Sequence, residues 1–302
     1  MAALPACTAD ATALLPLPQP SRPFLQPIGA IVLDTAEWGF GGFSGLHLAP
    51  DLTLTAISDI GHWWRAPLLL RDGQLTGIGG VRHGPLRDAA GVALPRFPLG
   101  DAESLARLPN GDWLVGFERR HRILRYRDLA GPGVPFDTPP GLTGSPNNGG
   151  LEALTMLTDG RLLAITEGLP GPAGPTSRMA WIGSRVGTRM NWAPTSYIPA
   201  ADMDPTDAAA LPDGGVLVLE RSFSLFRGFR ARLARIAPEG LRANGPLMAE
   251  TWLDLPPDAA AENWEGVAVT WHGGQVLVAL VSDDNQSPLQ QSLLLLYAMA
   301  GD

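Results

Sequence analysis

The sequence has no lysine, and this absence limits how the protein can bind anions. All 22 of its basic residues are arginines, against 30 acidic residues, which gives a formal net charge of −8. Any bound anion must therefore contact guanidinium groups, which favour planar and often bidentate hydrogen bonding. The sequence isoelectric point of about 5.1 argues against nucleic acid as a partner.

Long apolar runs and helical periodicity are also missing. No stretch approaches the roughly 18 apolar residues that indicate a membrane-spanning helix, so we expect no transmembrane segment. No window holds apolar residues at a sustained helical spacing of about 3.6 residues. Glycine (36 residues) and proline (29 residues) are instead abundant in this chain of 302 residues, which favours many tight turns between short strands.

The single cysteine, Cys7, cannot form an intrachain disulfide, so cysteine pairing does not indicate a redox compartment. Its context, Leu-Pro-Ala-Cys followed by a stretch rich in proline and alanine, resembles the junction of a bacterial lipoprotein. We therefore expect residues 1–27 to be a flexible leader or lipoprotein-type tether with a lipid anchor at Cys7. Residues 28–302 would form one domain of a monomeric periplasmic or secreted protein. The alternative is an ordinary flexible N-terminal tail.

One unit recurs along the chain: an acidic residue, an apolar strand, a turn, a second apolar strand and a second acidic residue. Three clear copies, 103–118, 152–167 and 207–220, are centred on Asn-Gly or Asp-Gly turns. Weaker copies lie at 44–59 and 265–283. Their first positions are spaced 59, 49, 55 and 58 residues apart, and a period of this length is typical of the blades of a β-propeller.

The predicted fold is therefore all-β, a single β-propeller with five blades. A sixth blade is possible, because residues 71–99 and 127–148 have weak strand signals and could hide one. The last blade runs out of chain after a third strand near 292–298, whereas residues 29–34 form an isolated strand. Open sheet edges aggregate, so we expect this N-terminal strand to join the C-terminal blade and close the propeller.

The acidic residues at the ends of each copy predict a metal site. Positions equidistant from a two-residue hairpin turn face each other at about 5 Å, where like charges repel. The first strand of each blade lines the channel of a propeller, so these acids would converge at one mouth. Ca²⁺, a hard cation with oxygen ligands, would compensate their charge, whereas the five histidines lack the spacing of zinc ligands. With Ser44 completing the inner ring, the predicted ligands are Asp59, Glu103, Glu118, Glu152, Glu167, Asp207, Glu220, Glu265 and Asp283.

Each of these acids, taken singly, could instead be a solvated turn residue. The predicted catalytic residues are Arg119 and Arg221, which each follow the second acid of a copy, and His62. Beside a bound cation, the arginines would hold an anionic group of the substrate. His62 and the aromatic and basic residues at 63–65 would overhang the same mouth. The alternatives are neutralisation of adjacent glutamates by the arginines and packing of the tryptophans in the core.

Common catalytic motifs are absent: the sequence has no G-x-S-x-G elbow, phosphate-binding loop or dinucleotide fingerprint. The segments GGLEALTMLTDGRLLAITEG, TDAAALPDGGVLVLERSFS and NWEGVAVTWHGGQVLVALVSDD resemble the family described as esterase-like activity of phytase, over roughly residues 40–298. The resemblance implies a secreted or periplasmic bacterial propeller, distantly akin to calcium-dependent β-propeller phytases. The recurring acids of that family match Glu103, Glu118, Glu152, Glu167, Asp207, Glu220 and Glu265 here. The calcium phytases also use lysines on phosphate, which this chain lacks.

The leading functional hypothesis is a calcium-dependent hydrolase of small-molecule phosphoesters, in which Glu152 or Glu220 acts as general base. The absence of lysine makes a less charged phosphoester than phytate, or another ester, the better substrate. Two alternatives remain open. One is a non-catalytic cell-envelope propeller that carries a structural calcium ion and binds a glycan, peptide or protein. The other is a calcium-dependent lactonase or carboxylic esterase.

Overall fold

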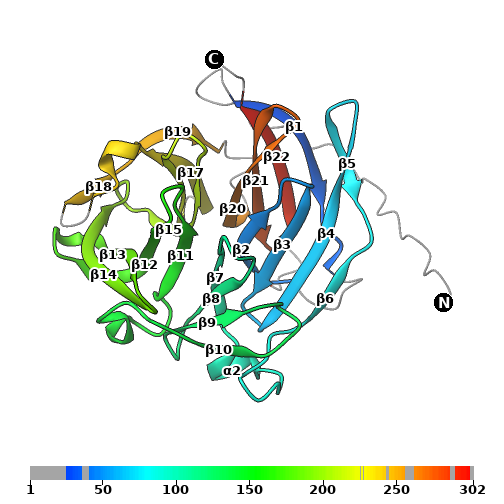
Figure 1. The fold of residues 1–302 in the computed structure, drawn as a ribbon. Coiled ribbons are helices and arrows are strands. Elements are labelled where there is room, and N and C mark those ends of the chain that lie inside the picture. The colour runs from blue at the N-terminus through cyan, green and yellow to red at the C-terminus, as the bar shows by residue number, and fades with distance from the viewer. Residues whose placement is uncertain are drawn as a thin grey trace.

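A computed structural model describes residues 25–35, 41–224, 226, 228–242, 245–255, 262–285 and 290–299. Five sheets, antiparallel apart from one short edge strand, are arranged in a ring around the central axis of the propeller, along which its channel runs (Figure 1). The innermost strands of neighbouring sheets pack against one another around this channel. The prediction of an all-β propeller with five blades is confirmed. Among the described residues, no helix is long and apolar enough to cross a membrane.

The blades follow one another along the chain, and the first strand of each is the innermost. Blade one contains β2 (Phe43–Leu48), β3 (Thr53–Ser58), β4 (His62–Arg71), β5 (Gln74–Ile78) and β6 (Arg82–Pro85). The short helix α2 (Arg96–Leu99) leads into blade two, which contains β7 (Ala102–Arg107), β8 (Trp113–Phe117), β9 (Arg122–Tyr126) and β10 (Gly133–Phe136). The segments in which a sixth blade could have hidden contribute to β5, β6, α2, β10 and the 3-10 turn η1 (Leu142–Gly144) instead.

Blade three contains β11 (Leu151–Met156), β12 (Leu162–Gly171), β13 (Gly174–Val186) and β14 (Arg189–Ile198). Its outermost strand, β14, pairs in parallel with β18 (Pro246–Met248). Strand β18 belongs to a connection within blade four, and this connection also contains the 3-10 turn η2 (Pro238–Gly240). Blade four contains β15 (Asp204–Ala210), β16 (Val216–Ser224), β17 (Gly228–Ile236) and β19 (Glu250–Asp254). Blade five contains β20 (Asn263–His272), β21 (Gln275–Asp283) and β22 (Leu293–Met299).

The N-terminal strand closes the ring as predicted. Strand β1 (Leu25–Val32) pairs antiparallel with β22 and becomes the fourth strand of blade five, so the blue strand β1 lies beside the red strand β22 in Figure 1. Strand β1 begins at Leu25, inside the predicted leader 1–27. The rest of that leader, with Cys7, lies outside the described residues.

The turns within the blades differ from the predicted two-residue hairpins. In blade two the amide of Leu108 donates to the carbonyl of Asp112 at 2.8 Å, so the turn encloses three residues, and Gly111 has a left-handed φ of 88°. A three-residue loop that ends in a left-handed glycine is a standard hairpin turn. Blades three and four repeat it with Gly160 and Gly214.

A β-bulge at the start of the innermost strand changes the register further. Ala102 pairs with Phe117 and Ser104 with Gly116, which leaves Glu103 without a partner across the strand pair. All five innermost strands show this irregularity at the same place. The predicted face-to-face pairing of acids equidistant from the turn is therefore wrong, because a bulge sets two residues of one strand against one of the other.

The core lies mainly between the blades and fills the spaces between neighbouring sheets. Trp64 is 1% exposed and packs edge-on against Phe43, with ring centroids 5.8 Å apart. Trp63 is also buried. The expectation that this pair overhangs the channel mouth is wrong, because both side chains belong to the core.

Candidate metal centre at the channel mouth

The bulges define two rings of side chains at one mouth of the channel. The inner ring consists of the residues in or at the bulges, which are Ser44, Glu103, Glu152, Thr206 and Glu265. The outer ring consists of the equivalent residues at the ends of the second strands, which are Asp59, Glu118, Glu167, Arg221 and Asp283. Together the rings hold seven carboxylates and one guanidinium.

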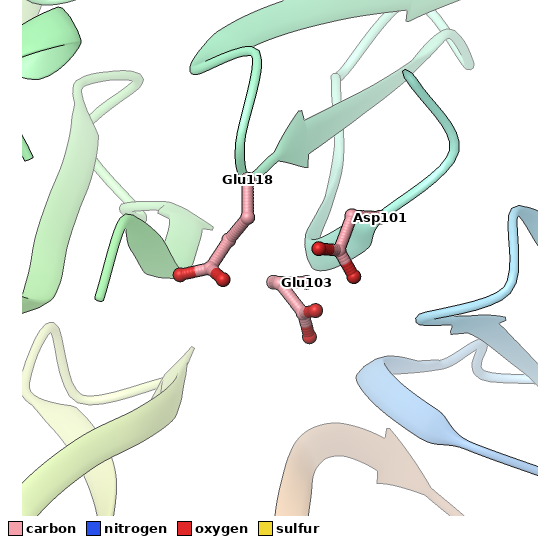
Figure 2. Close-up of side chains that lie close together, drawn as sticks. All are labelled: Asp101, Glu103 and Glu118. Atoms are coloured by element: carbon pink, nitrogen blue, oxygen red, sulfur yellow. The ribbon is translucent and has the colours of Figure 1, made fainter. Parts of the chain in front are cut away.

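The tightest acidic group in the described part of the chain lies on blade two. Oxygen atoms of Asp101, Glu103 and Glu118 all lie within 4.8 Å of one another. Figure 2 shows the three carboxylates directed toward a common space from one end of the β7–β8 pair, where β7 begins and β8 ends. This cluster could hold a metal ion.

Backbone and arginine contacts fix the geometry of this cluster. Glu118 Oε1 accepts hydrogen bonds from the amides of Gly149 at 2.6 Å and Gly150 at 2.5 Å, at the entry to blade three. A side chain at Gly150 would lie 2.6 Å from the His121 ring, so glycine lets the backbone come this close. Arg119 donates from Nε to Asp101 Oδ2 at 2.6 Å, which orients the third carboxylate.

The two central glutamates are strongly perturbed. Burial raises the pKa of Glu103 well above its ordinary value, and the Asp101 and Glu118 carboxylates raise it further, whereas the Ser44 hydroxyl opposes the rise. Burial likewise raises the pKa of Glu152, with added repulsion from Glu103 and Glu118. Without a compensating charge, burial and mutual repulsion favour the protonated form of such carboxyls.

The same perturbation extends around the ring. Burial raises the pKa of Asp283 to about 8, helped by the Glu265 carboxylate. Burial raises the pKa of Glu167 to about 7, although the positive charge of Arg221 counteracts it. Burial also raises the pKa of Glu265, again against Arg221, and of Asp59, against Arg96.

Arg221 is the cation built into this mouth. It takes the outer-ring position of blade four, which is acidic in the other four blades. Its Nη2 lies 2.9 Å from Glu265 Oε1 and 3.7 Å from Glu167 Oε1, so it bridges blades three and five. These carboxylates raise the pKa of Arg221 despite its burial, which keeps the guanidinium charged.

Glu220 lies one residue before the ring position, and its side chain is fully buried away from the mouth acids. Arg232 donates to both of its oxygens, at 2.7 and 3.0 Å. The Tyr197 hydroxyl and the Ala200 amide donate to the same carboxylate. Glu220 was predicted to be a metal ligand and a candidate general base, but these donors occupy both of its carboxylate oxygens. Its contacts instead join blades three and four.

Asp207 lies one residue after the bulge and is fully buried among the innermost strands. Its carboxylate accepts hydrogen bonds from the amides of Ala208 at 2.8 Å, Val267 at 2.9 Å and Leu46 at 3.3 Å. It therefore ties blade four to blades five and one, and the ring position predicted for it is held by Thr206.

The three predicted catalytic residues lie in different surroundings. Arg221 is in the outer ring, and Arg119 borders the mouth through its ion pair with Asp101. The two arginines are not at equivalent positions, because Arg221 matches Glu118. His62 begins β4, two strands outward from the channel, where burial lowers its pKa.

The sequence analysis predicted no role for two residues at the mouth, Asp101 and His121. Asp101 precedes the repeat unit by two positions, and its carbonyl accepts from the Glu118 amide while its carboxylate pairs with Arg119, which brings it into the acidic cluster. His121 lies across Gly150 from Glu118, and its buried Nδ1 has no partner among the described residues. Three arginines flank His121 in the sequence, and their charge is a stronger signal than the single imidazole.

The side chains of the mouth fit a hard divalent cation. The candidate ligands are all carboxylate oxygens, the donor type that Ca²⁺ prefers. Asp59 Oδ1 is buried and has no hydrogen-bond partner in the described part of the chain. A buried, unpaired oxygen among acids with raised pKa values is the environment that a bound cation stabilises.

The chain matches the family model described as "Phytase-like: Esterase-like activity of phytase" over residues 38–286. The chain belongs to this family. Membership of the Phytase-like family supports a hydrolase-type propeller. No curated protein sequence matches the chain significantly.

Solved structures are similar to the chain at low sequence identity. The α-L-arabinofuranosidase PaAbf62A from Podospora anserina, in complex with cellotriose, is 11% identical with a TM-score of 0.50, over 90% of this chain and 94% of that one. The gluconolactonase XC5397 from Xanthomonas campestris is 12% identical with a TM-score of 0.44, over 96% of this chain and 100% of the other. Virginiamycin B lyase from Staphylococcus aureus is 12% identical with a TM-score of 0.41, and the match covers 84% of this chain but only 65% of the lyase. At 11% identity, the likeness to the arabinofuranosidase concerns the fold alone.

Proposed function

We propose that this member of the Phytase-like family is a metal-dependent hydrolase that uses Ca²⁺ to cleave small phosphoesters at the acidic channel mouth. One observation carries the proposal: the oxygens of Asp101, Glu103 and Glu118 lie within 4.8 Å of one another, beside further buried ring carboxylates. Acids gathered so closely favour a bound divalent cation.

The cation would be held by Asp101, Glu103 and Glu118, and the charges of Asp59 and Glu152, which act on this cluster, would add to its electrostatic stabilisation. When bound, a divalent cation supplies Lewis acidity toward an ester oxygen and eases the ionisation of an attacking water. Arg119 pairs with Asp101 of this cluster, Arg221 lies in the same outer ring beside Glu265, and both would orient the anionic group of the substrate. Their guanidinium groups would also stabilise negative charge that develops in the transition state.

Glu152 is the general base of this proposal. Its buried carboxyl has a raised pKa, and a carboxylate with a raised pKa is a stronger base than an ordinary one. Glu220, the other candidate base, has both oxygens occupied by Arg232, Tyr197 and Ala200. Glu152 would accept the proton of the attacking water.

The test is release of nitrophenol from 4-nitrophenyl phosphate by EDTA-treated protein, with and without added Ca²⁺, combined with elemental analysis. We expect Ca²⁺ to restore turnover and Glu103→Gln to abolish the restoration. Asp213→Asn, in the turn at the other end of blade four, should behave as wild type because Asp213 pairs only with the turn and Arg235. Protein without metal and with equal rates in both buffers would overturn the proposal.

Carboxylic esters or lactones are a second candidate class, favoured by the state of the arginines. Arg221 already pairs with Glu265, and Arg119 with Asp101, so neither guanidinium offers a full positive charge to a phosphate dianion. A neutral ester requires less positive charge at the site. Turnover of 4-nitrophenyl acetate without turnover of the phosphate, under the same Ca²⁺ conditions, would assign this class.

A further inference from the structure

A cavity lies at the end of the propeller opposite the acidic mouth. Its volume is about 630 Å³, and its lining comes from the turn ends of the innermost strands, such as Pro50 and Pro109. Much of the wall is small and apolar, including Ala208, Ala209 and Ala268. Cavities of roughly 300–1,000 Å³ with apolar walls and a few polar groups are typical of small-molecule sites.

The polar groups of this end are basic. His47 and Arg107 belong to the lining. The guanidinium of Arg107 stacks on Trp113 at 4.1 Å from the ring centroid, and that of Arg65 lies over the same ring at 5.6 Å. The His47 ring meets Trp113 edge-on at 5.1 Å. Trp113 thus gathers two guanidinium groups and an imidazole between blades one and two.

The sheets impose this arrangement. His47, Thr55 and Arg65 form a row across three adjacent strands of blade one, because His47 pairs with Thr55 and Thr55 with Arg65. Arg107 and Trp113 are cross-strand partners in blade two. Arg65 donates from Nε to Thr55 Oγ1 at 3.2 Å, which fixes its position.

Neither arginine forms a direct ion pair with a carboxylate in the part of the chain that the structure describes, although Asp51, Asp112 and Asp128 attract them at longer range. The nearest acids have other partners: Asp51 accepts from the Thr53 amide at 2.9 Å, Asp128 from the Ala130 amide at 3.2 Å, and Asp112 pairs with Arg125. The buried Nδ1 of His47 also lacks a partner among the described residues. Elsewhere an arginine stacked on a tryptophan is neutralised, since Arg235 lies over Trp252 and pairs with Asp213 at 2.6 Å.

We propose that this basic end of the channel binds a small organic oxyanion, a carboxylate or phosphate that carries a compact apolar group. Arg107 and Arg65 would hold the oxyanion, because unpaired guanidinium groups favour bidentate contacts with planar or tetrahedral oxygens. Neutral His47 would donate or accept one further hydrogen bond through Nδ1. The apolar group would lie on the alanine wall. This site is separate from the acidic mouth and does not depend on the function proposed there.

The probes are benzoate, phenyl phosphate and inorganic phosphate, titrated calorimetrically into EDTA-treated full-length protein at low ionic strength. We expect saturable binding of at least one aromatic anion, and tighter binding of phenyl phosphate than of inorganic phosphate. Arg107→Gln should weaken that binding about 10- to 100-fold, the effect of losing a charged hydrogen-bond donor. Arg107→Lys, which keeps the charge and much of the packing, should weaken it less and guards against misfolding of the first variant.

Arg235→Gln is the matched control, because it alters an arginine that stacks on tryptophan but has a carboxylate partner. Its affinity for the probes should equal that of wild type. Arg221→Gln tests where the probes bind. A probe that binds at the acidic mouth would lose its binding in this variant, whereas a probe that binds at the basic end would keep it. The proposal is overturned by absence of binding of every probe, by unchanged affinity in both Arg107 variants when they are folded, or by loss of binding in Arg221→Gln alone.

Discussion

Blade two and blade four carry similar residues at the channel mouth and present opposite charges to it. In both, a glutamate followed by an arginine ends the second strand: Glu118-Arg119 and Glu220-Arg221. In blade two the glutamate occupies the outer ring and joins the acidic cluster. In blade four the arginine occupies the equivalent position, and the glutamate is buried between blades.

A difference of one residue produces this exchange. The turn of blade two ends at Asp112 and that of blade four at Gly215. Glu118 follows its turn by six residues, whereas Glu220 follows by five and Arg221 by six. Successive side chains of a strand point to opposite faces, so a shift of one position moves a side chain from the mouth to the blade interface. Identical residue pairs can therefore have opposite roles.

The sharpest test of this comparison replaces the glutamate of each blade by its neutral isostere. Glu220→Gln should lower the free energy of unfolding by about 3–5 kcal/mol, because it leaves buried Arg232 without its charged partner. Glu118→Gln should change it by about 1 kcal/mol or less, because a glutamine oxygen can still accept from Gly149 and Gly150. Urea unfolding of metal-free protein measures both values. Equal losses in the two variants would contradict the assignment of Glu118 to the mouth and Glu220 to the interface.

The second test concerns the arginine that blade four gives to the ring. Arg221→Lys should lower turnover by about 10²–10³-fold, because a point charge replaces the guanidinium that would stabilise the transition state. Arg161→Lys is the control, since Arg161 pairs with Asp159 in the turn of blade three and contacts the Leu241 carbonyl. The readout is kcat with aryl phosphate and Ca²⁺. A similar loss in Arg161→Lys would point to folding rather than to the site.

A sequence-based interpretation predicts much of this architecture for clear physical reasons. Asn-Gly and Asp-Gly turns between apolar strands identify the hairpins, and their period identifies the blades. The strand at 29–34 had no hairpin neighbour, and the need to cover an open edge correctly placed it beside the last blade. These features depend on local turn chemistry and on repetition, both of which are visible in the chain.

The ring assignments were less predictable, because the register depends on features that single residues do not reveal. The glycine of each turn fits either a two-residue or a three-residue loop, and the bulge at the innermost strand has no residue signature common to all blades. Asp207 and Glu220 were consequently placed in the rings, which Thr206 and Arg221 occupy. Asp101 was missed because its role arises from a contact with Arg119 across the strand pair.

The third test measures how much a bound cation stabilises the folded protein through the carboxylates of the acidic blades. If Ca²⁺ binds the folded protein only, it should stabilise it by about 2.7 kcal/mol at a concentration 100 times its dissociation constant. The midpoint of thermal unfolding should therefore rise with Ca²⁺ concentration and fall with EDTA. Glu103→Gln should remove most of this dependence, whereas Glu220→Gln should keep it, because the Glu220 oxygens face Arg232 and Tyr197. A midpoint independent of Ca²⁺ in wild-type protein would exclude a stabilising metal site at the mouth.

The smallest expected effect is a dependence of the free energy of unfolding on pH. Because Arg221 modifies this dependence, it also distinguishes blade four from the others. In the folded metal-free protein the pKa of Glu167 is raised to about 7 and that of Asp283 to about 8, mainly by burial. Between about pH 4.5, near the ordinary carboxyl pKa, and these raised values, the unfolded chain has released these protons while the folded state still holds them, and the difference fades as the pH passes about 8. Stability must therefore fall as the pH rises through this window, by at most about 1.4 kcal/mol per pH unit for each retained proton.

Asp283→Asn should flatten the slope. Arg221→Gln should extend the loss to higher pH, because Arg221 holds down the pKa of Glu167 and Glu265. Urea unfolding across the window decides the matter, and a stability that is flat or rises with pH would show that these carboxyls titrate as ordinary surface acids.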